Sequence, residues 1–353
     1  MKEIIKTGFA WARYNRERIR WRPRNLQFDS LTASEKKQVD RLWGGVWTKP
    51  SYRWHEHYKS VNGKFDARYL PCDVFYLDVL PKLSNLKLAA AWEDKSYYSE
   101  RFPDIPFPKL LYACIDDQIC DSHLSPCSYK DVWETVVNKQ SVFVKPSLGS
   151  YQGIGSFILS AVDIGDLDFV EALSRTGSNY VIQELIHQHD FFAELNQDSV
   201  NIIRINTLNL GQGPTLLNAT VRFGISGRVT DMCYVDGVET VRVAGITGDG
   251  YLRKEFAWQD GRRSALTTIG FSRGGNKVPG FDEALELCYS LHNRMLHFGL
   301  CAFDVAITKD GSPIVVEVNL GGPGVVFYQY AHGPFFGEQT GEVITYCLST
   351  KAR

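Results

Sequence analysis

Asp304, Glu317 and Asn319 are the residues whose types and spacing most directly suggest chemistry. They belong to two apolar runs on either side of Asp310-Gly311, a dipeptide typical of a two-residue type I′ hairpin turn. That turn would place Asp304 opposite Glu317, and the alternation of side chains would put Asn319 on the same face. The other face would carry apolar side chains and pack beneath a helix; these are Phe303, Val305, Ile307, Ile314, Val316 and Val318.

Two carboxylates that face each other across a strand pair repel, so a positive group is expected between Asp304 and Glu317. Carboxylate and amide oxygens suit a hard cation, and Mg²⁺ is commonly held by one or two carboxylates together with substrate phosphates. A nearby arginine or lysine would neutralise the pair equally well. The hairpin alone therefore leaves a metal site and a structural ion pair open.

A strand that ends at Lys145 and continues into the Gly-rich loop Ser147–Gly155 is a second candidate site. Glycines let backbone N–H groups approach phosphate oxygens, and a lysine adds a positive charge. The loop has neither the Gly-Lys-Ser/Thr of a Walker A motif nor a strict GxGxxG pattern. A simple hairpin turn would use the same glycines, so phosphate binding and an ordinary turn both remain open.

Two arginines lie within apolar strands. Arg204 belongs to Val200–Asn206 and Arg222 to Leu217–Arg222. A buried arginine usually has an anionic partner, because leaving its charge unpaired is costly. The partner could be a phosphate or carboxylate ligand, or one of the hairpin carboxylates in a structural ion pair.

The elements that would position these residues follow from apolar periodicity and turn residues. Helices are predicted over Asp166–Ser174, over Phe281–Phe298 with Gly299 at its C-terminal cap, and over Thr340–Leu348, while residues 1–60 are expected to be helical. The combination of predicted helices and strands indicates an α+β (mixed α/β) fold in about three lobes. The predicted strands, antiparallel from Val200 onward, are Ser141–Pro146, Ser156–Ser160, Tyr180–Ile186, Val200–Leu210, Leu216–Ile225 and Val229–Tyr234.

Bulk composition excludes several classes of function. The chain has 353 residues and a net charge of −1, which does not favour nucleic acid as a partner. No apolar run is long enough to span a membrane, and a cytoplasmic protein is expected. The first 24 residues are basic and aromatic, so they could contact an anionic membrane surface peripherally or pack as a surface helix. Eight cysteines without a CxxC pair indicate reduced thiols rather than a zinc site.

These motifs, together with Glu93-Asp94-Lys95 and Gln183-Glu184, occur in an order that resembles the ATP-grasp superfamily. The closest resemblance is to the sugar-transfer-associated ATP-grasp group found with polysaccharide biosynthesis genes, and it runs from about Phe65 to Gly324. It implies an ATP-grasp fold of three lobes, with the nucleotide between two α+β subdomains and a C-terminal antiparallel sheet. It also implies an N-terminal domain over 1–100, a lid subdomain over 101–183 and a C-terminal subdomain over 184–353.

The resemblance implies roles for individual residues. Arg204, Lys145 and Asn201 would act in catalysis, and Asp304, Glu317 and Asn319 would hold one or two Mg²⁺ ions. The implied ATP-binding residues are Lys95, Lys145, Ser147, Gly149, Ser150, Gly153, Gly155, Gln183, Glu184, Leu185, Ile186 and Asp190, and the implied substrate contacts are Arg222, Asp231, Gly321 and Gly322.

In enzymes of this kind a substrate carboxylate takes the γ-phosphoryl group of ATP, and an amine then attacks the acyl phosphate to give an amide, ADP and phosphate. The resemblance implies a uronic-acid sugar and an amino acid or amine as partners, in capsular or exopolysaccharide biosynthesis. Two alternatives stay open. One is an ATP-dependent phosphotransferase without an amine acceptor, and the other is a non-catalytic module that binds ATP or a glycan.

Overall fold

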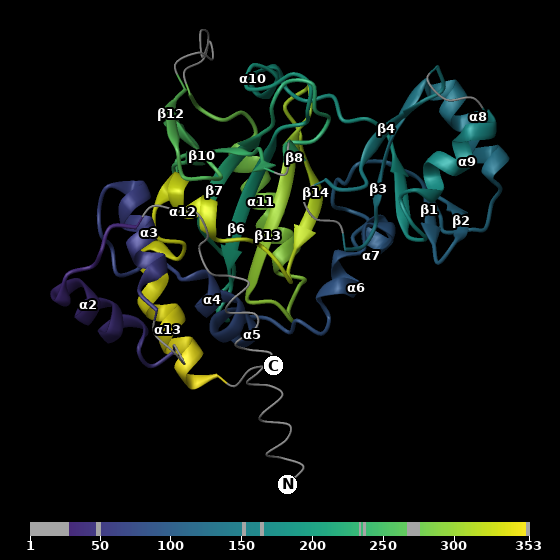
Figure 1. The fold of residues 1–353 in the computed structure, drawn as a ribbon. Coiled ribbons are helices and arrows are strands. Elements are labelled where there is room, and N and C mark those ends of the chain that lie inside the picture. Colours follow the sequence, from purple (N-terminus) through teal and green to yellow (C-terminus); the bar gives the residue numbers. More distant parts are fainter. Residues whose placement is uncertain are drawn as a thin grey trace.

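The computed structural model describes residues 28–46, 51–149, 153–162, 166–232, 234–235, 238–266 and 276–350. Within these ranges the chain forms a helical N-terminal part, a five-stranded sheet and a seven-stranded sheet (Figure 1). The basic start of the chain and Ser150 of the Gly-rich loop lie outside the described residues, so the predictions about them stay predictions. No helix within the described ranges has the length and apolar character needed to cross a membrane.

The N-terminal part is a series of short helices. α2 (Ala33–Trp43) begins at a capping box, in which Thr32 and Glu35 each accept a hydrogen bond from the other's backbone N–H. Trp43 of α2 and Tyr58 of α3 (Arg53–Asn62) are fully buried in a shared core, so the helical prediction is confirmed at both helices. The elements that follow are α4 (Cys72–Val74), η1 (Phe75–Val79), α5 (Leu80–Leu83), α6 (Ala89–Glu93), η2 (Lys95–Tyr97) and α7 (Tyr98–Arg101).

The smaller sheet has the strand order β2-β1-β5-β3-β4, and all its neighbouring strands are antiparallel. Its buried valines and leucines pack against two helices, α8 (Tyr129–Lys139) and α9 (Asp166–Ser174). This layer holds the strand that carries Lys145. The strands are β1 (Leu110–Ile115), β2 (Gln118–Asp121), β3 (Ser141–Pro146), β4 (Phe157–Ser160) and β5 (Tyr180–Gln183).

The larger sheet has the order β12-β11-β10-β7-β6-β13-β14 and is also antiparallel. One face packs on α11 (Phe281–His292) in the largest apolar core. The opposite face carries the arginines and carboxylates singled out in the sequence. The strands are β6 (Ile202–Leu208), β7 (Thr215–Phe223), β10 (Arg242–Ile246), β11 (Leu252–Trp258), β12 (Arg263–Ala265), β13 (Leu300–Ile307) and β14 (Pro313–Asn319).

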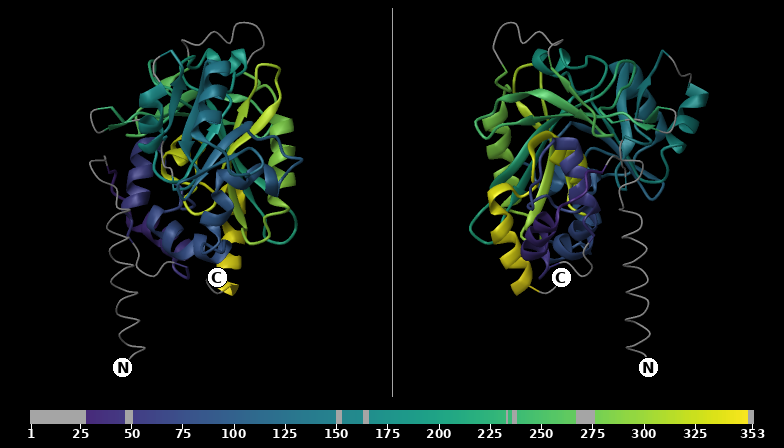
Figure 2. Two further views of the ribbon diagram at one scale, coloured as in Figure 1. Left: turned by 90° about the vertical axis from the view of Figure 1, so that its right-hand side faces the viewer. Right: turned by 60° about the vertical axis from the view of Figure 1, so that its left-hand side comes forward.

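The remaining elements connect or cover these layers. α12 (Val326–His332) contacts both α3 and the strands β10 and β11. Figure 2 shows the N-terminal helices (purple) beside the C-terminal helices (yellow) at one end of the larger sheet. Short pieces complete the described chain: α10 (Asp190–Ala193), β8 (Tyr234–Val235), β9 (Val238–Glu239), η3 (Gly337–Gln339) and α13 (Thr340–Ser349).

The hairpin of β13 and β14 has the predicted carboxylate pair but not the predicted turn. Thr308 N–H donates to the Ser312 carbonyl, and Ile307 pairs with Pro313, so three residues form the loop instead of two. Gly311 adopts a φ of +91° in this loop, which fits a three-residue hairpin with a glycine in the left-handed region. The type I′ prediction is therefore wrong.

A β-bulge between Asp304 and Val305 then restores the predicted register, so that Asp304 pairs with Glu317. Val316 is the extra residue of β14, and the bulge turns Val315 rather than Val316 into the core beside Val318. The expectation that Val316 and Ile314 would lie in the core is therefore wrong, because it assumed an uninterrupted ladder.

Other boundaries also differ from expectation. α11 ends at His292, and Asn293 rather than Gly299 is its C-terminal cap. Val229–Tyr234 is not a strand over its described residues, apart from Tyr234 at the start of β8. The α+β class is confirmed, with two large antiparallel sheets and a two-stranded one, β8-β9, within the described residues. These sheets fall within the predicted segments 101–183 and 184–353, and the division into domains stays a prediction.

Candidate functional site

The candidate site is a cavity of about 890 Å³ between the two sheets, a size typical of small-molecule sites. The smaller sheet contributes side chains from β3, β4 and β5, and the larger sheet contributes side chains from β6, β7, β13 and β14. Most of the predicted functional residues meet here, although they come from distant parts of the sequence. Those that line the cavity are Lys95, Lys145, Gly153, Gln183, Glu184, Leu185, Ile186, Asp190, Arg204, Arg222, Asp231, Asp304, Glu317, Asn319 and Gly322.

Each of the two opposed carboxylates has a cationic partner. Asp304 is buried between two arginines, with Arg204 Nε 2.5 Å from Oδ1 and Arg222 Nη2 3.0 Å from Oδ2. Glu317, whose side chain is 25% exposed, accepts from Lys95 Nζ at 2.8 Å. The structure therefore contains the ion pairs that the sequence left open as one alternative.

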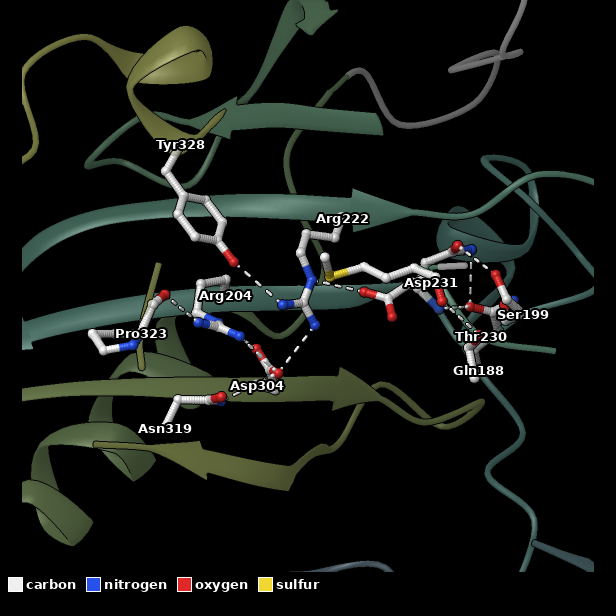
Figure 3. Close-up of polar contacts among 12 residues, drawn as sticks. Gln188, Ser199, Arg204, Arg222, Thr230, Asp231, Asp304, Asn319, Pro323 and Tyr328 are labelled. Atoms are coloured by element: carbon white, nitrogen blue, oxygen red, sulfur yellow. Dashed lines mark hydrogen bonds and ion pairs between the residues drawn. The ribbon is translucent and has the colours of Figure 1, made fainter. Parts of the chain in front are cut away.

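The arginines belong to a chain of buried charges on the sheet face (Figure 3). Arg222 Nε donates to Asp231 Oδ2 at 2.7 Å, and its Nη2 reaches Asp304, which Arg204 also holds. Burial raises the pKa of Asp304, but the two arginines outweigh burial and hold that pKa below its usual range. Burial raises the pKa of Asp231 above its usual range, although Arg222 opposes the change.

Two lysines complete the charged part of the cavity. Lys145, at the end of β3, donates from Nζ to the Val316 carbonyl at 3.3 Å, and that carbonyl belongs to the bulged residue of β14. Lys95 Nζ donates to the Ser147 carbonyl at 3.4 Å as well as pairing with Glu317. Burial lowers the pKa of Lys145 to about 7, and the positive charge of Lys95 adds to that effect.

We expect ATP binding to weaken as the pH rises above the pKa of Lys145. A lysine with a lowered pKa is charged below that pKa and neutral above it, so the free protein must take up a proton before Lys145 can pair with a phosphate. The apparent Kd should rise about tenfold for each pH unit above about 7. Isothermal titration calorimetry of ATP binding across this range measures the slope.

Lys145→Arg is the control, because a guanidinium stays charged over the same range. Its Kd should show a much flatter pH dependence, while ionisation of ATP itself affects both proteins equally. Identical slopes for the wild-type protein and Lys145→Arg would contradict the assignment of Lys145 to phosphate binding.

At the end of the cavity that is predicted to bind the nucleotide, two predicted contacts already have protein partners. Glu184 accepts from Lys139 at 2.7 Å and pairs with Lys109 at 3.2 Å, and Asp190 pairs with Lys309. Both acidic side chains are partly or largely exposed. Both carboxylates form ion pairs with lysines, so their contact with ATP stays a prediction.

Gly153 of the Gly-rich loop lies against the segment that follows β7. Gly153 has a φ of +70°, and a Cβ built on it would lie 2.8 Å from the Thr230 side chain. The predicted residues Ser147, Gly149 and Gly155 lie outside the cavity lining. The buried hydroxyl of Ser147 has no hydrogen-bond partner among the described residues, so its contact with a phosphate stays a prediction.

Asn201 and Gly321 lie beside the site rather than in its lining. The Asn201 amide Nδ2 donates to three acceptors in the loop 188–196. The backbone N–H of Gly321 donates to Glu93 Oε1 at 2.8 Å. These bonds connect Asn201 to the segment before β6 and Gly321 to Glu93, and the predicted catalytic role of Asn201 and substrate contact of Gly321 stay predictions.

Two tyrosines of the site were not predicted from the sequence. Tyr328 OH accepts from Arg222 Nη1 at 3.2 Å, and the Arg204 guanidinium lies 5.5 Å from the centre of the Tyr328 ring. Tyr76 OH accepts from the N–H of Gly324 at 3.1 Å. Tyr328 could have been noticed because it follows closely on the Gly-Gly-Pro-Gly turn after Asn319; nothing local singles out Tyr76.

The side chains present fit a magnesium ion. Oδ1 of Asp304 accepts a single N–H among the described residues, and each carboxylate oxygen has two lone pairs. Glu317 and Asn319 line the same cavity. The described ranges hold no cluster of three or more His, Cys, Asp and Glu side chains. The ion would therefore depend on two carboxylates, one amide and phosphate oxygens, a donor set usual for Mg²⁺.

Comparisons with known proteins bear on the same region. Residues 93–343 match the sequence model of a family described as sugar-transfer associated ATP-grasp. A search of curated proteins gave no match.

Solved structures with a similar arrangement include three ligases. They are the ATP-grasp ligase PsnB complexed with a minimal precursor (12% identity, TM-score 0.42), the VanG D-Ala:D-Ser ligase from Enterococcus faecalis (10%, 0.44) and D-alanyl-alanine synthetase A from Vibrio cholerae (14%, 0.43). Each match covers 74% of this chain. The chain spans 62%, 62% and 65% of those proteins, respectively, which is less than two thirds of their length.

Proposed function

Because the chain belongs to the sugar-transfer-associated ATP-grasp family, we propose that it is an ATP- and Mg²⁺-dependent ligase that activates a carboxylate and joins it to an amine. The observation that carries this proposal is the meeting of Lys95, Lys145, Arg204, Asp304 and Glu317 around one cavity. Cations from both sheets there face a pair of carboxylates. That combination suits a triphosphate with its metal ion better than it suits a neutral ligand.

In this proposal the residues bind and neutralise, and none becomes covalently modified. Lys95 and Lys145 bind phosphate oxygens, and Arg204 offsets the charge that spreads over the transferring phosphoryl group. Asp304, Glu317 and Asn319 would hold Mg²⁺, which would supply further charge neutralisation when bound. The loop that carries Gly153 covers the reacting groups and limits the access of water.

We further propose that the acid is a uronic-acid sugar and that the acceptor is an amino acid or amine. The family description associates its members with sugar transfer, and that association supports a sugar acid as the substrate. The product would be an amide formed in capsular or exopolysaccharide biosynthesis. We also propose a cytoplasmic location, because ATP is supplied there.

A screen of ADP release tests the proposal. Purified protein is incubated with ATP, Mg²⁺, a panel of uronic acids and a panel of amino acids and amines. ADP should form rapidly only when an acid and an amine are both present, and mass spectrometry should detect the amide.

The screen also separates the alternatives. ADP release without an amine, together with a stable phosphorylated product, would identify a phosphotransferase. Tight ATP binding without ADP release across all pairs would favour a non-catalytic module. Either outcome would overturn the ligase proposal.

A further inference from the structure

A ligase of the proposed kind needs a group that removes a proton from the incoming amine, because an ammonium ion has no free electron pair. A carboxylate can serve when it lies in the cavity and has an oxygen free to accept. Among the described residues, six carboxylates line the cavity: Glu184, Asp190, Asp198, Asp231, Asp304 and Glu317.

Most of these carboxylates already have hydrogen-bond or ion-pair partners, or lie at the end of the cavity that is predicted to bind the nucleotide. Glu184 and Asp190 are paired with lysines at the nucleotide end. Asp304 accepts four N–H groups from three residues, and Glu317 pairs with Lys95 beside the phosphate-binding lysine. Asp198 accepts a hydrogen bond from the backbone N–H of Gly227.

Asp231 is different in three respects. Its side chain is 13% exposed, and it lines the cavity beside the buried arginines. Among the described residues it receives a single hydrogen bond, from Arg222 Nε to Oδ2, which fixes the carboxylate and leaves Oδ1 to accept from a ligand. Arg222 also contacts Asp304, so one guanidinium connects Asp231 with the carboxylate pair where activation is proposed.

We infer that Asp231 binds the ammonium group of the amine substrate and accepts its proton. This inference rests on the proposed ligase function and adds the acceptor side of the site to it. The burial that raises the pKa of Asp231 makes its carboxylate a better proton acceptor than an ordinary aspartate.

The proposed step balances as follows. Asp231 takes one proton from the ammonium, and the nitrogen electron pair forms the C–N bond with the acyl carbon. The bond between that carbon and the phosphate oxygen breaks, and its electron pair leaves with inorganic phosphate. The second proton on nitrogen passes to the departing phosphate, and Asp231 releases its own proton to solvent.

Asp231→Asn tests the inference, because the amide keeps the size of the side chain and an acceptor for Arg222 but cannot take a proton. The acid probes are D-glucuronic and D-galacturonic acid, and two acceptors are compared. Glycine is an ammonium ion near neutral pH and needs a base, whereas hydroxylamine is largely neutral and does not. The variant should form the glycine amide at least about a hundredfold more slowly while it forms the hydroxamate within about threefold of the wild-type rate.

Asp104→Asn is the matched control, because it removes an aspartate that also pairs with an arginine, Arg294, but lies outside the cavity lining, so both rates should stay near the wild-type values. Equal losses with glycine and hydroxylamine in Asp231→Asn would assign Asp231 a structural role, and no loss with either would also overturn the inference. If Asp231→Asn no longer binds ATP, Asp231→Ala replaces it, because alanine also lacks a proton acceptor, and the same split between acceptors is expected. A wild-type protein that makes neither product nor ADP would instead show that the proposed function has failed.

Discussion

Glu317→Ala is expected to abolish ATP-dependent turnover while the protein remains folded. Glu317 is one of the two carboxylates proposed for the metal, and losing one transition-state-stabilising group typically costs on the order of a hundredfold or more in kcat. Its side chain is partly exposed and has Lys95 as its ion-pair partner. Lys95 is buried, but it keeps its hydrogen bond to the Ser147 carbonyl when Glu317 is removed.

The measurement combines ADP release with circular dichroism and thermal melting. Glu171→Ala is the control, because Glu171 is an exposed carboxylate that also pairs with a cation, Arg175, outside the cavity. That variant should turn over at the wild-type rate. Turnover near the wild-type rate in Glu317→Ala would contradict the metal assignment of the hairpin.

Asp304→Asn is expected to lower the free energy of unfolding by about 3–5 kcal/mol. Asp304 is buried between Arg204 and Arg222 and accepts from both. An amide would leave the two guanidinium groups without the negative charge between them, and Asp231 can offset only Arg222. The loss should appear as a lower midpoint in urea unfolding, and turnover should be lost as well.

A double variant separates the charge effect from a general packing effect. Arg204→Met together with Asp304→Asn removes one positive and one negative charge, so its net charge at the site matches the wild type. It should be more stable than Asp304→Asn alone, because fewer buried charges are left unpaired. A loss below about 1 kcal/mol in the single variant would mean that the buried charge chain contributes little to stability.

The hairpin illustrates how far sequence reasoning could reach. The dipeptide Asp310-Gly311 correctly indicated a turn, and side-chain alternation correctly placed Asp304 opposite Glu317. That agreement came from two offsets that cancel, a turn one residue longer than expected and a bulge at Val316. Neither the longer turn nor the bulge can be recognised from the local sequence, because both depend on how the strands pack against α11 and the neighbouring sheet.

The site itself was partly predictable. A mid-strand arginine needs an anion, so Arg204 and Arg222 could be assigned to the cavity region with either a ligand or Asp304 as partner. The sequence could not reveal that Asp304 would serve both arginines at once, because that requires β6, β7 and β13 to be neighbours in the sheet. Tyr76 was even harder to predict, because it belongs to the N-terminal helices and contacts the loop after β14.

The bulge at Val316 also makes the strand pairing at the tip of the hairpin independent of the pairing at Asp304 and Glu317. The same fourteen residues from Asp304 to Glu317 could close either through a two-residue turn with an even ladder or through the observed longer turn with one extra residue in β14. Both arrangements hold the two carboxylates opposite each other. A substitution that changes the turn type would therefore shift only the residues between the bulge and the tip. The tip of the hairpin would tolerate substitutions that would not be tolerated at the two carboxylates.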